Sequence, residues 1–200
     1  MIIGQGQVAM DPIKLTAIRN WKPPASVKGI QSFLGFANFY HKFIPNFSHV
    51  IAPLNLLTWK DQLWAWTPLR QKAFDTLHKA FSLGPVLSIP DVTHPFSIMT
   101  DTSLFAAGAV LLQDYTNGDS HPCAYFSKTF IPAERNYDIY NHELLAVIPA
   151  LNKWKQYVLG ISFPVTIITN HKNLSYIKDP HKLFRHQARW SLFLPDFDIV

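Results

Sequence analysis

The segment from Pro95 to Gln113 constrains the fold of this chain more than any other. It contains two short apolar runs, at 96 to 101 and at 105 to 113, with a brief polar turn between them. Runs of this length around a turn predict a pair of antiparallel strands. Asp101 ends the first strand, where a carboxylate can face a cleft and hold a cation. The alternative is a turn residue whose carboxylate accepts a hydrogen bond from the nearby backbone.

The chain after Gln113 predicts an α/β layer. In order, it predicts a strand at 122 to 128, a long helix from Pro132, a strand at 164 to 169, a helix at about 182 to 194 and the start of a strand at 197 to 200. Three successive strands indicate an antiparallel meander, and a strand that follows a long helix indicates a mixed sheet. Pro149 lies inside the long helix, where it removes one backbone hydrogen bond and predicts a kink.

The first 84 residues have helical spacing instead. A short amphipathic helix is predicted at 11 to 22. Ser26 is a suitable N-cap for a second helix with a buried apolar stripe. Thr67 and Pro68 have the residue types that begin a further helix, and this helix is predicted to end near Gly84. We therefore expect a mostly helical region before the α/β layer.

The net charge of +5 is unevenly distributed. Successive blocks of fifty residues carry +4, +1, −4 and +4. Basic ends around an acidic middle suit a protein that binds a polyanion along its flanks while it keeps carboxylates together for a metal. The alternative is that the charged residues only solvate the surface.

The composition predicts a globular intracellular protein, cytoplasmic if expressed and not secreted. An apolar share of 48% is enough for a core. The single Cys123 excludes a disulfide framework and the usual cysteine-based zinc site, which fits a reducing compartment. The sequence has no run of about 18 apolar residues and no signal-peptide pattern, so we expect no membrane partner.

Three positions carry the candidate chemistry. Asp101 ends one strand, Glu143 lies in the long helix and Asn170 ends a later strand. In a mixed sheet, neighbouring strand ends and a facing helix can project to one edge, so we expect these side chains to lie together. Acidic groups there could bind two divalent cations, which activate water and stabilise the leaving oxygen of a phosphodiester. At the third position the chain offers an amide in place of a carboxylate.

Six segments occur in the order MDPIKLTAIRNW, VKGIQSFLGFANFYHKFIPNFS, TDTSLFAAGAVLLQ, AERNYDIYNHELLAV, TNHKNLSYI and RHQARWSLFLPDFDI. Together they resemble the C-terminal part of the reverse transcriptase polyprotein of gypsy-type LTR retrotransposons. The resemblance implies a thumb and connecting region at 11 to 92, after a remnant N-terminal tail at 1 to 10. It implies that residues 93 to 200 form an RNase H-like domain, a mixed sheet with flanking helices. Such a domain cleaves RNA in an RNA–DNA hybrid and uses Mg²⁺ or Mn²⁺.

The same resemblance assigns the site residues. The first catalytic Asp of the family matches Asp101, its catalytic Glu matches Glu143, and its third Asp falls on Asn170. The fourth lies in a segment beyond residue 200, so we expect a domain truncated at its C-terminus, without the polymerase palm and fingers of the parent polyprotein. We therefore expect very weak or no hydrolysis and no polymerase activity. The alternative is a non-catalytic nucleic-acid-binding module, or a relic without function.

Further residues are candidates for contacts with the hybrid. Those proposed for phosphates and sugars are Lys128, Arg135, Lys172, Arg185, Arg189, Tyr137 and Tyr140. The alternative for each is a solvated surface position or ordinary core packing.

Overall fold

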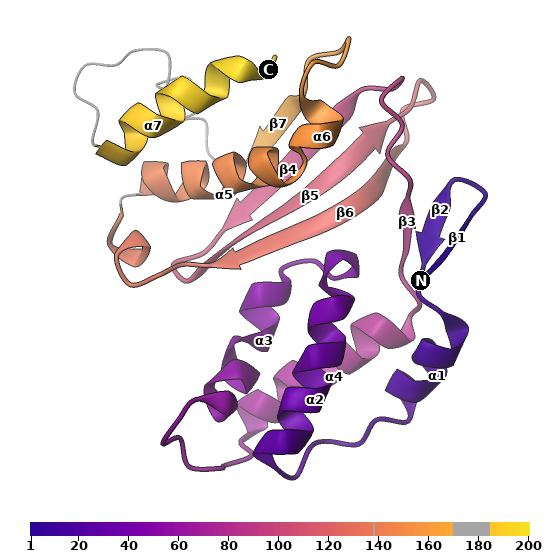
Figure 1. The fold of residues 1–200 in the computed structure, drawn as a ribbon, viewed down its shortest axis with the longest axis vertical. Helices are drawn as coiled ribbons and strands as arrows, with labels where there is room; N and C mark the ends of the chain where they lie inside the picture. Colours follow the sequence, from indigo (N-terminus) through magenta and orange to yellow (C-terminus); the bar gives the residue numbers. More distant parts are fainter. Residues whose placement is uncertain (138, 170–184) are drawn as a thin grey trace.

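The structure is a computed structural model, and it describes residues 1–137, 139–169 and 185–200. Figure 1 shows a helical N-terminal region beside a four-stranded sheet, with further helices on the other side of that sheet. The arrangement is the predicted α/β architecture: a helical region followed by a mixed sheet with flanking helices. Among the described residues no helix is both long enough and apolar enough to span a membrane.

The chain opens with a hairpin. Strands β1 (Ile2–Gly4) and β2 (Gln7–Ala9) pair with each other, and β2 pairs with β3 (Val86–Ser88), all antiparallel. Gln5 and Gly6 form the turn with positive φ angles of 52° and 72°, as a type I′ hairpin turn requires. The residues expected to be a remnant tail thus form part of a small sheet.

Four helices build the N-terminal region. They are α1 (Pro12–Arg19), α2 (Val27–Phe39), α3 (Phe47–Asn55) and α4 (Pro68–Ser82), with 3₁₀ turns at His41–Phe43 and Leu56–Thr58. The predicted caps are confirmed, because the side chains of Ser26 and Thr67 accept hydrogen bonds from the backbone N–H groups of Gly29 and Arg70. The apolar faces of these helices meet in a core that includes Phe33, Phe74 and Leu77.

The larger sheet follows the expected order. Its strands are β4 (Phe96–Thr102), β5 (Ala106–Asp114), β6 (Ser120–Thr129) and β7 (Thr166–Thr169). Their order is β6-β5-β4-β7; the first three are antiparallel and β7 is parallel to β4. Both the predicted meander and the predicted mixed sheet are confirmed. Ile199 forms a parallel bridge with Val165, so the chain end runs beside β7, where a strand start was predicted.

Helices cover one face of this sheet (Figure 1). They are α5 (Ile139–Lys153), α6 (Lys155–Val158) and α7 (Arg185–Phe193), with 3₁₀ turns at Glu134–Asn136 and Leu194–Asp196. The predicted start of the long helix at Pro132 is wrong, because the extended backbone of Tyr137 separates the first 3₁₀ turn from α5. Pro149 lies inside α5 as predicted. Val147 and Leu151 of α5 share a core with Phe96 of β4.

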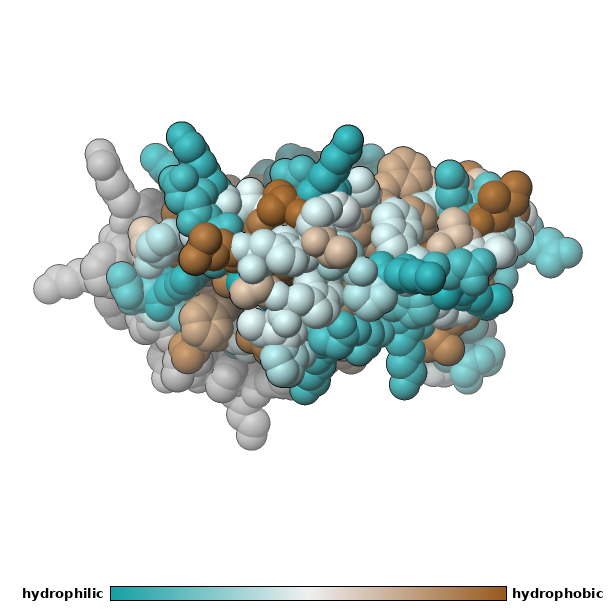
Figure 2. Space-filling view, turned by 90° about the horizontal axis from the view of Figure 1, so that it is seen from below, coloured by the Kyte–Doolittle hydropathy of each residue, from teal (hydrophilic) through white to brown (hydrophobic). Residues whose placement is uncertain are grey.

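The helical region lies against the opposite face of the sheet. The N–H of Ser48, in the first turn of α3, donates to Oγ of Ser127 in β6, at 2.8 Å. Tyr125 of β6 packs against the core of the helical region. Figure 2 views the helical region from below and shows mainly hydrophilic side chains, with separate smaller hydrophobic patches between them. The sheet is therefore enclosed between α5 on one side and the helical region on the other.

Candidate active site

Glu143 lies on the α5 side of the sheet and is 5% exposed. The hydroxyl of Thr102, in β4, donates to its Oε1 at 2.7 Å. The hydroxyl of Thr169, in β7, donates to its Oε2 at 2.8 Å. The Glu143 carboxylate therefore links α5 to two neighbouring strands of the sheet through both of its oxygens.

Asp101 points to the other face of the same sheet. It pairs with Gly108 of β5, whereas the next residue, Thr102, pairs with Ala107. Ala107 belongs to the same small core as Leu145 of α5, and Thr102 donates to Glu143 of α5, so both residues face α5. Successive side chains of a strand point to opposite faces, which directs Asp101 away from α5 and toward the helical region.

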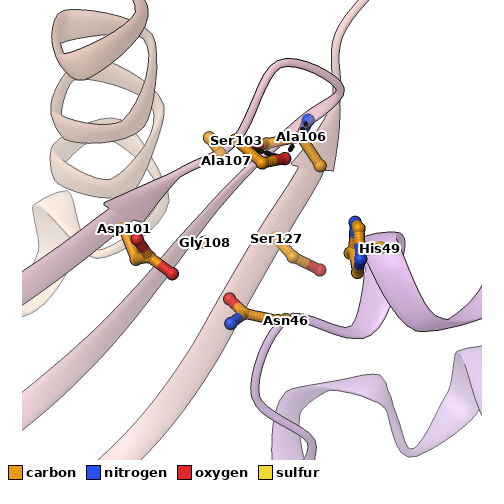
Figure 3. Close-up of a pocket in the computed structure, with 8 residues that line it drawn as sticks. All are labelled: Asn46, His49, Asp101, Ser103, Ala106, Ala107, Gly108 and Ser127. Atoms are coloured by element: carbon orange, nitrogen blue, oxygen red, sulfur yellow. Dashed lines mark hydrogen bonds between the residues drawn. The ribbon is translucent and has the colours of Figure 1, made fainter.

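Figure 3 shows the pocket that Asp101 faces. The pocket has a volume of about 200 Å³ and lies between the start of α3 and strands β4, β5 and β6. Its lining residues are Asn46, His49, Asp101, Ser103, Ala106, Ala107, Gly108 and Ser127. Asp101, Asn46 and His49 are exposed to solvent. Asp101, the first of the predicted catalytic residues, therefore borders a pocket on the side of the helical region.

The structure does not bring Asp101 and Glu143 together. Glu143 faces the sheet from α5, whereas Asp101 borders the pocket on the other face. Among the described residues no three His, Cys, Asp or Glu side chains form a metal-binding group. Asn170 lies outside the described residues. The donors that are described do not fit the two-metal centre that the resemblance implies, because one carboxylate faces α3 and the other faces the sheet from α5.

Two predicted phosphate contacts have partners within the chain. The Nζ of Lys128 lies 2.6 Å from Oε1 of Glu134. The Nε of Arg135 donates to the carbonyl of Phe130 at 3.2 Å, and its guanidinium lies over the Phe105 ring. Both cations are therefore held near the end of the sheet that the β4 to β5 turn occupies.

The other predicted contacts differ in their environments. Tyr137 packs against the small core around Phe130, which favours the alternative of core packing over a sugar contact. Arg189 is exposed on α7. Lys172 lies outside the described residues, and so do the side chains of Tyr140 and Arg185.

Asn46 was missed in the sequence, although one signal pointed to this region. An isolated glycine inside a strand pattern often marks a close backbone approach, and Gly108 is such a residue. A Cβ at position 108 would lie 2.0 Å from Oδ1 of Asn46. Asn46 itself adopts a left-handed conformation with φ 50° immediately before α3. The sequence carries no comparable signal for the contact between Ser48 and Ser127.

Known proteins are similar to this chain in sequence. Residues 91–197 match the family described as the RNase H-like domain found in reverse transcriptase. The Transposon Tf2-3 and Tf2-4 polyproteins of Schizosaccharomyces pombe are each 35% identical to the chain over 183 residues. The match covers 90% of this chain but only 14% of each polyprotein.

Solved structures share the fold. A foamy viral protease-reverse transcriptase in complex with dsDNA has a TM-score of 0.76, with 23% identity over 96% of this chain and 40% of that one. The same type of protein in complex with an RNA/DNA hybrid has a TM-score of 0.74, again with 23% identity, over 96% of this chain and 26% of that one. At this level of identity the likeness extends to the fold alone.

Proposed function

Because the chain belongs to the family of RNase H-like domains found in reverse transcriptase, we propose that it binds nucleic-acid duplexes, RNA–DNA hybrids among them, without cleaving the RNA strand. One observation carries the second half of this proposal. The Asp101 side chain faces the pocket beside α3, whereas Glu143, on α5, faces the sheet from its other side. Two-metal hydrolysis requires carboxylates that share cations, so carboxylates on opposite faces of the sheet support the absence of cleavage.

The charge of the chain supports binding to a polyanion. Its net charge is +5 and its isoelectric point is about 9.3. A basic protein gains affinity for nucleic acid by releasing counterions from the phosphates, whatever the sequence of the duplex. The similar solved structures are complexes with dsDNA and with an RNA/DNA hybrid, which makes both duplexes the natural ligands to test.

Asn170 supports the absence of hydrolysis on separate grounds. The resemblance places a third metal-binding aspartate at this position, and an amide carries no negative charge. A hard cation such as Mg²⁺ binds through anionic oxygens and gives up its water reluctantly. We therefore interpret the chain as the binding scaffold of an RNase H-like domain whose hydrolytic site is impaired.

The test measures binding and cleavage on the same substrate. The purified chain is titrated into a fluorescently labelled RNA–DNA hybrid at several salt concentrations, and the RNA is then examined on a gel after incubation with Mg²⁺ or Mn²⁺. We expect saturable binding that weakens as salt increases, and intact RNA. Cleavage that Asp101→Asn abolishes would overturn the non-hydrolytic part. Absence of binding at low salt would overturn the binding part.

A further inference from the structure

The turn between β4 and β5 exposes two large apolar side chains. Leu104 is 67% exposed and Phe105 is 55% exposed, although turn residues are typically small or polar. Ile131, just after the end of β6, is 56% exposed. The end of β6 is joined to the turn, because the N–H of Phe130 donates to the carbonyl of Phe105 at 2.8 Å. One end of the sheet therefore presents apolar surface to solvent, which is typical of a binding surface.

Ser103 fixes the shape of this turn. Its Oγ accepts hydrogen bonds from the N–H groups of Phe105 and Ala106, at 3.3 Å and 3.2 Å. Its own N–H donates to the carbonyl of Ala106 at 2.9 Å. The backbone that carries Leu104 and Phe105 is therefore held in place before any partner binds, which lowers the entropic cost of association.

An exposed guanidinium lies beside these apolar side chains. Cζ of Arg135 is 5.6 Å from the centroid of the Phe105 ring, and its Nε donates to the carbonyl of Phe130 at 3.2 Å. Its Nη1 and Nη2 groups have no hydrogen-bond partner among the described residues. The surface therefore suits a partner that combines anionic groups with apolar ones. A nucleic-acid duplex has phosphates along its grooves and sugars and base edges within them, and it fits a chain of net charge +5.

The width of the minor groove distinguishes one duplex from another. The minor groove of B-DNA is about 6 Å wide, and apolar side chains enter it by unstacking and bending the duplex. An RNA–DNA heteroduplex has A-form geometry. The minor groove of an A-form helix is wide and shallow and displays sugars and base edges. A rigid turn with adjacent leucine and phenylalanine side chains can lie in this wide groove without bending the duplex.

We infer that the β4–β5 turn selects RNA–DNA hybrids over dsDNA: Leu104 and Phe105 lie in the wide minor groove of the hybrid, and Arg135 binds a phosphate beside it. The inference rests on the proposed binding function and adds to it the side chains that favour one duplex. The contact uses neither Asp101 nor Glu143, so it does not depend on cleavage.

The experiment measures the affinity of the complete 200-residue chain for a labelled RNA–DNA hybrid and for dsDNA of the same sequence, at several salt concentrations. We expect the unmodified chain to bind the hybrid several-fold more tightly. Leu104→Ala combined with Phe105→Ala should weaken hybrid binding by about fivefold or more and leave dsDNA binding nearly unchanged. The salt dependence of hybrid binding should stay the same, because apolar side chains release no counterions. Both residues are exposed, so the variant should fold, which circular dichroism checks.

Two further variants complete the test. Leu63→Ala is the matched control, because Leu63 is 84% exposed between α3 and α4, and its affinity for both duplexes should be unchanged. Arg135→Gln should reduce the slope of log affinity against log salt by about one, as the loss of one phosphate contact requires. An unchanged slope would overturn the assignment of Arg135.

The outcomes separate this inference from the binding function on which it rests. Hybrid binding by the double variant that equals binding by the unmodified chain would overturn the inference and leave the binding function intact. Equal weakening on both duplexes would overturn the selection of the hybrid. Absence of hybrid binding by the unmodified chain at low salt would overturn the binding function and the inference together.

Discussion

The hydroxyl of Thr102 donates a 2.7 Å hydrogen bond to Glu143, while Asp101, one residue earlier in β4, faces the other side of the sheet. Neighbouring side chains of a strand always face opposite sides of the sheet. Only a shift in strand register by one residue would exchange the two faces, and it would also turn the buried side chains of β4 outward. The Thr169 hydroxyl holds the second oxygen of Glu143. Glu143 therefore has a role in joining α5 to the sheet that is independent of any metal.

Replacing Thr102 with Val should lower the free energy of unfolding by about 2 kcal/mol. Val keeps the shape of Thr but removes the hydroxyl that donates to one oxygen of the buried Glu143 carboxylate. Thr169→Val should act in the same direction through the other oxygen. Urea denaturation followed by circular dichroism measures both effects.

Thr129→Val provides the matched control for these variants. Thr129 is exposed at the end of β6, and its hydroxyl makes no hydrogen bond within the described part of the chain. The substitution should therefore change the free energy of unfolding of the protein by less than about 0.5 kcal/mol. A double-mutant cycle between Thr102→Val and Glu143→Gln should give a clear coupling energy. Strictly additive effects would mean that the hydroxyl does not hold the carboxylate.

Gly108→Ala should destabilise the protein by about 1 to 3 kcal/mol, because its Cβ would overlap the Asn46 side chain. The variant tests whether the start of α3 rests directly on β5. Thermal unfolding measures the loss. Adding Asn46→Gly should recover most of it, since Gly tolerates the positive φ at that position and removes the overlapping amide.

Gly35→Ala is the control for a glycine without close neighbours. It is exposed in α2, and no atom lies within 4 Å of the Cβ position. Alanine there should be neutral or stabilise the helix by up to about 1 kcal/mol. If Gly108→Ala behaved like Gly35→Ala, the close contact between α3 and β5 would be refuted.

Much of the fold follows from local sequence signals. Ser26 and Thr67 begin helices because their side chains satisfy free N–H groups of the first turn. The strands at 96 to 102 and 106 to 114 follow from short apolar runs around a polar turn. The hairpin at residues 2 to 9 was not predicted. The strand that completes its sheet, β3, lies almost eighty residues later in the chain, so no local pattern indicates the pairing.

The candidate site was predicted only in part. The sequence placed Asp101 at the end of a strand and Glu143 in the facing helix, and both positions are confirmed. Which face each side chain takes depends on the strand register and on the start of α5, which bring Ala107 of β5 and Leu145 of α5 into one small core. The contribution of Asn46 depends on how the helical region docks on the sheet, which no local pattern encodes.

Stability should fall as the pH rises above 9. Burial raises the pKa of the Cys123 thiol from its ordinary value of 9.0 to about 11. Between these values the thiol is deprotonated in the unfolded chain and protonated in the folded one, so the unfolded state binds fewer protons and unfolding becomes easier. The contribution is complete below pH 9 and is lost as the pH approaches 11.

The measurement compares urea denaturation of the unmodified chain and of Cys123→Ala from pH 8 to pH 10.5, a range set by the pKa of about 11. The variant should show a shallower decline. Some decline should remain, because burial also raises the pKa of Tyr125. Identical slopes in the two proteins would show that the thiol ionises equally well in the folded state.

Asn170→Asp alone should not produce cleavage of an RNA–DNA hybrid. The substitution restores the acidic residue that the resemblance places there, but it leaves Asp101 directed toward the α3 pocket. The RNA is examined on a gel in Mg²⁺ and in Mn²⁺, with Asp101→Asn in the same background as the control for contaminating nuclease. Cleavage above that control would show that charge at position 170, and not the direction of Asp101, limits the reaction.

The most direct test of the account is a crystal structure of the chain grown in Mn²⁺, with the metal located by its anomalous scattering. We predict that the Asp101 carboxylate faces the pocket beside α3 and that the Glu143 carboxylate is still held by Thr102 and Thr169 on the other face of the sheet, with no Mn²⁺ shared between the two carboxylates. An anomalous peak coordinated by Asp101 and Glu143 together would contradict the account.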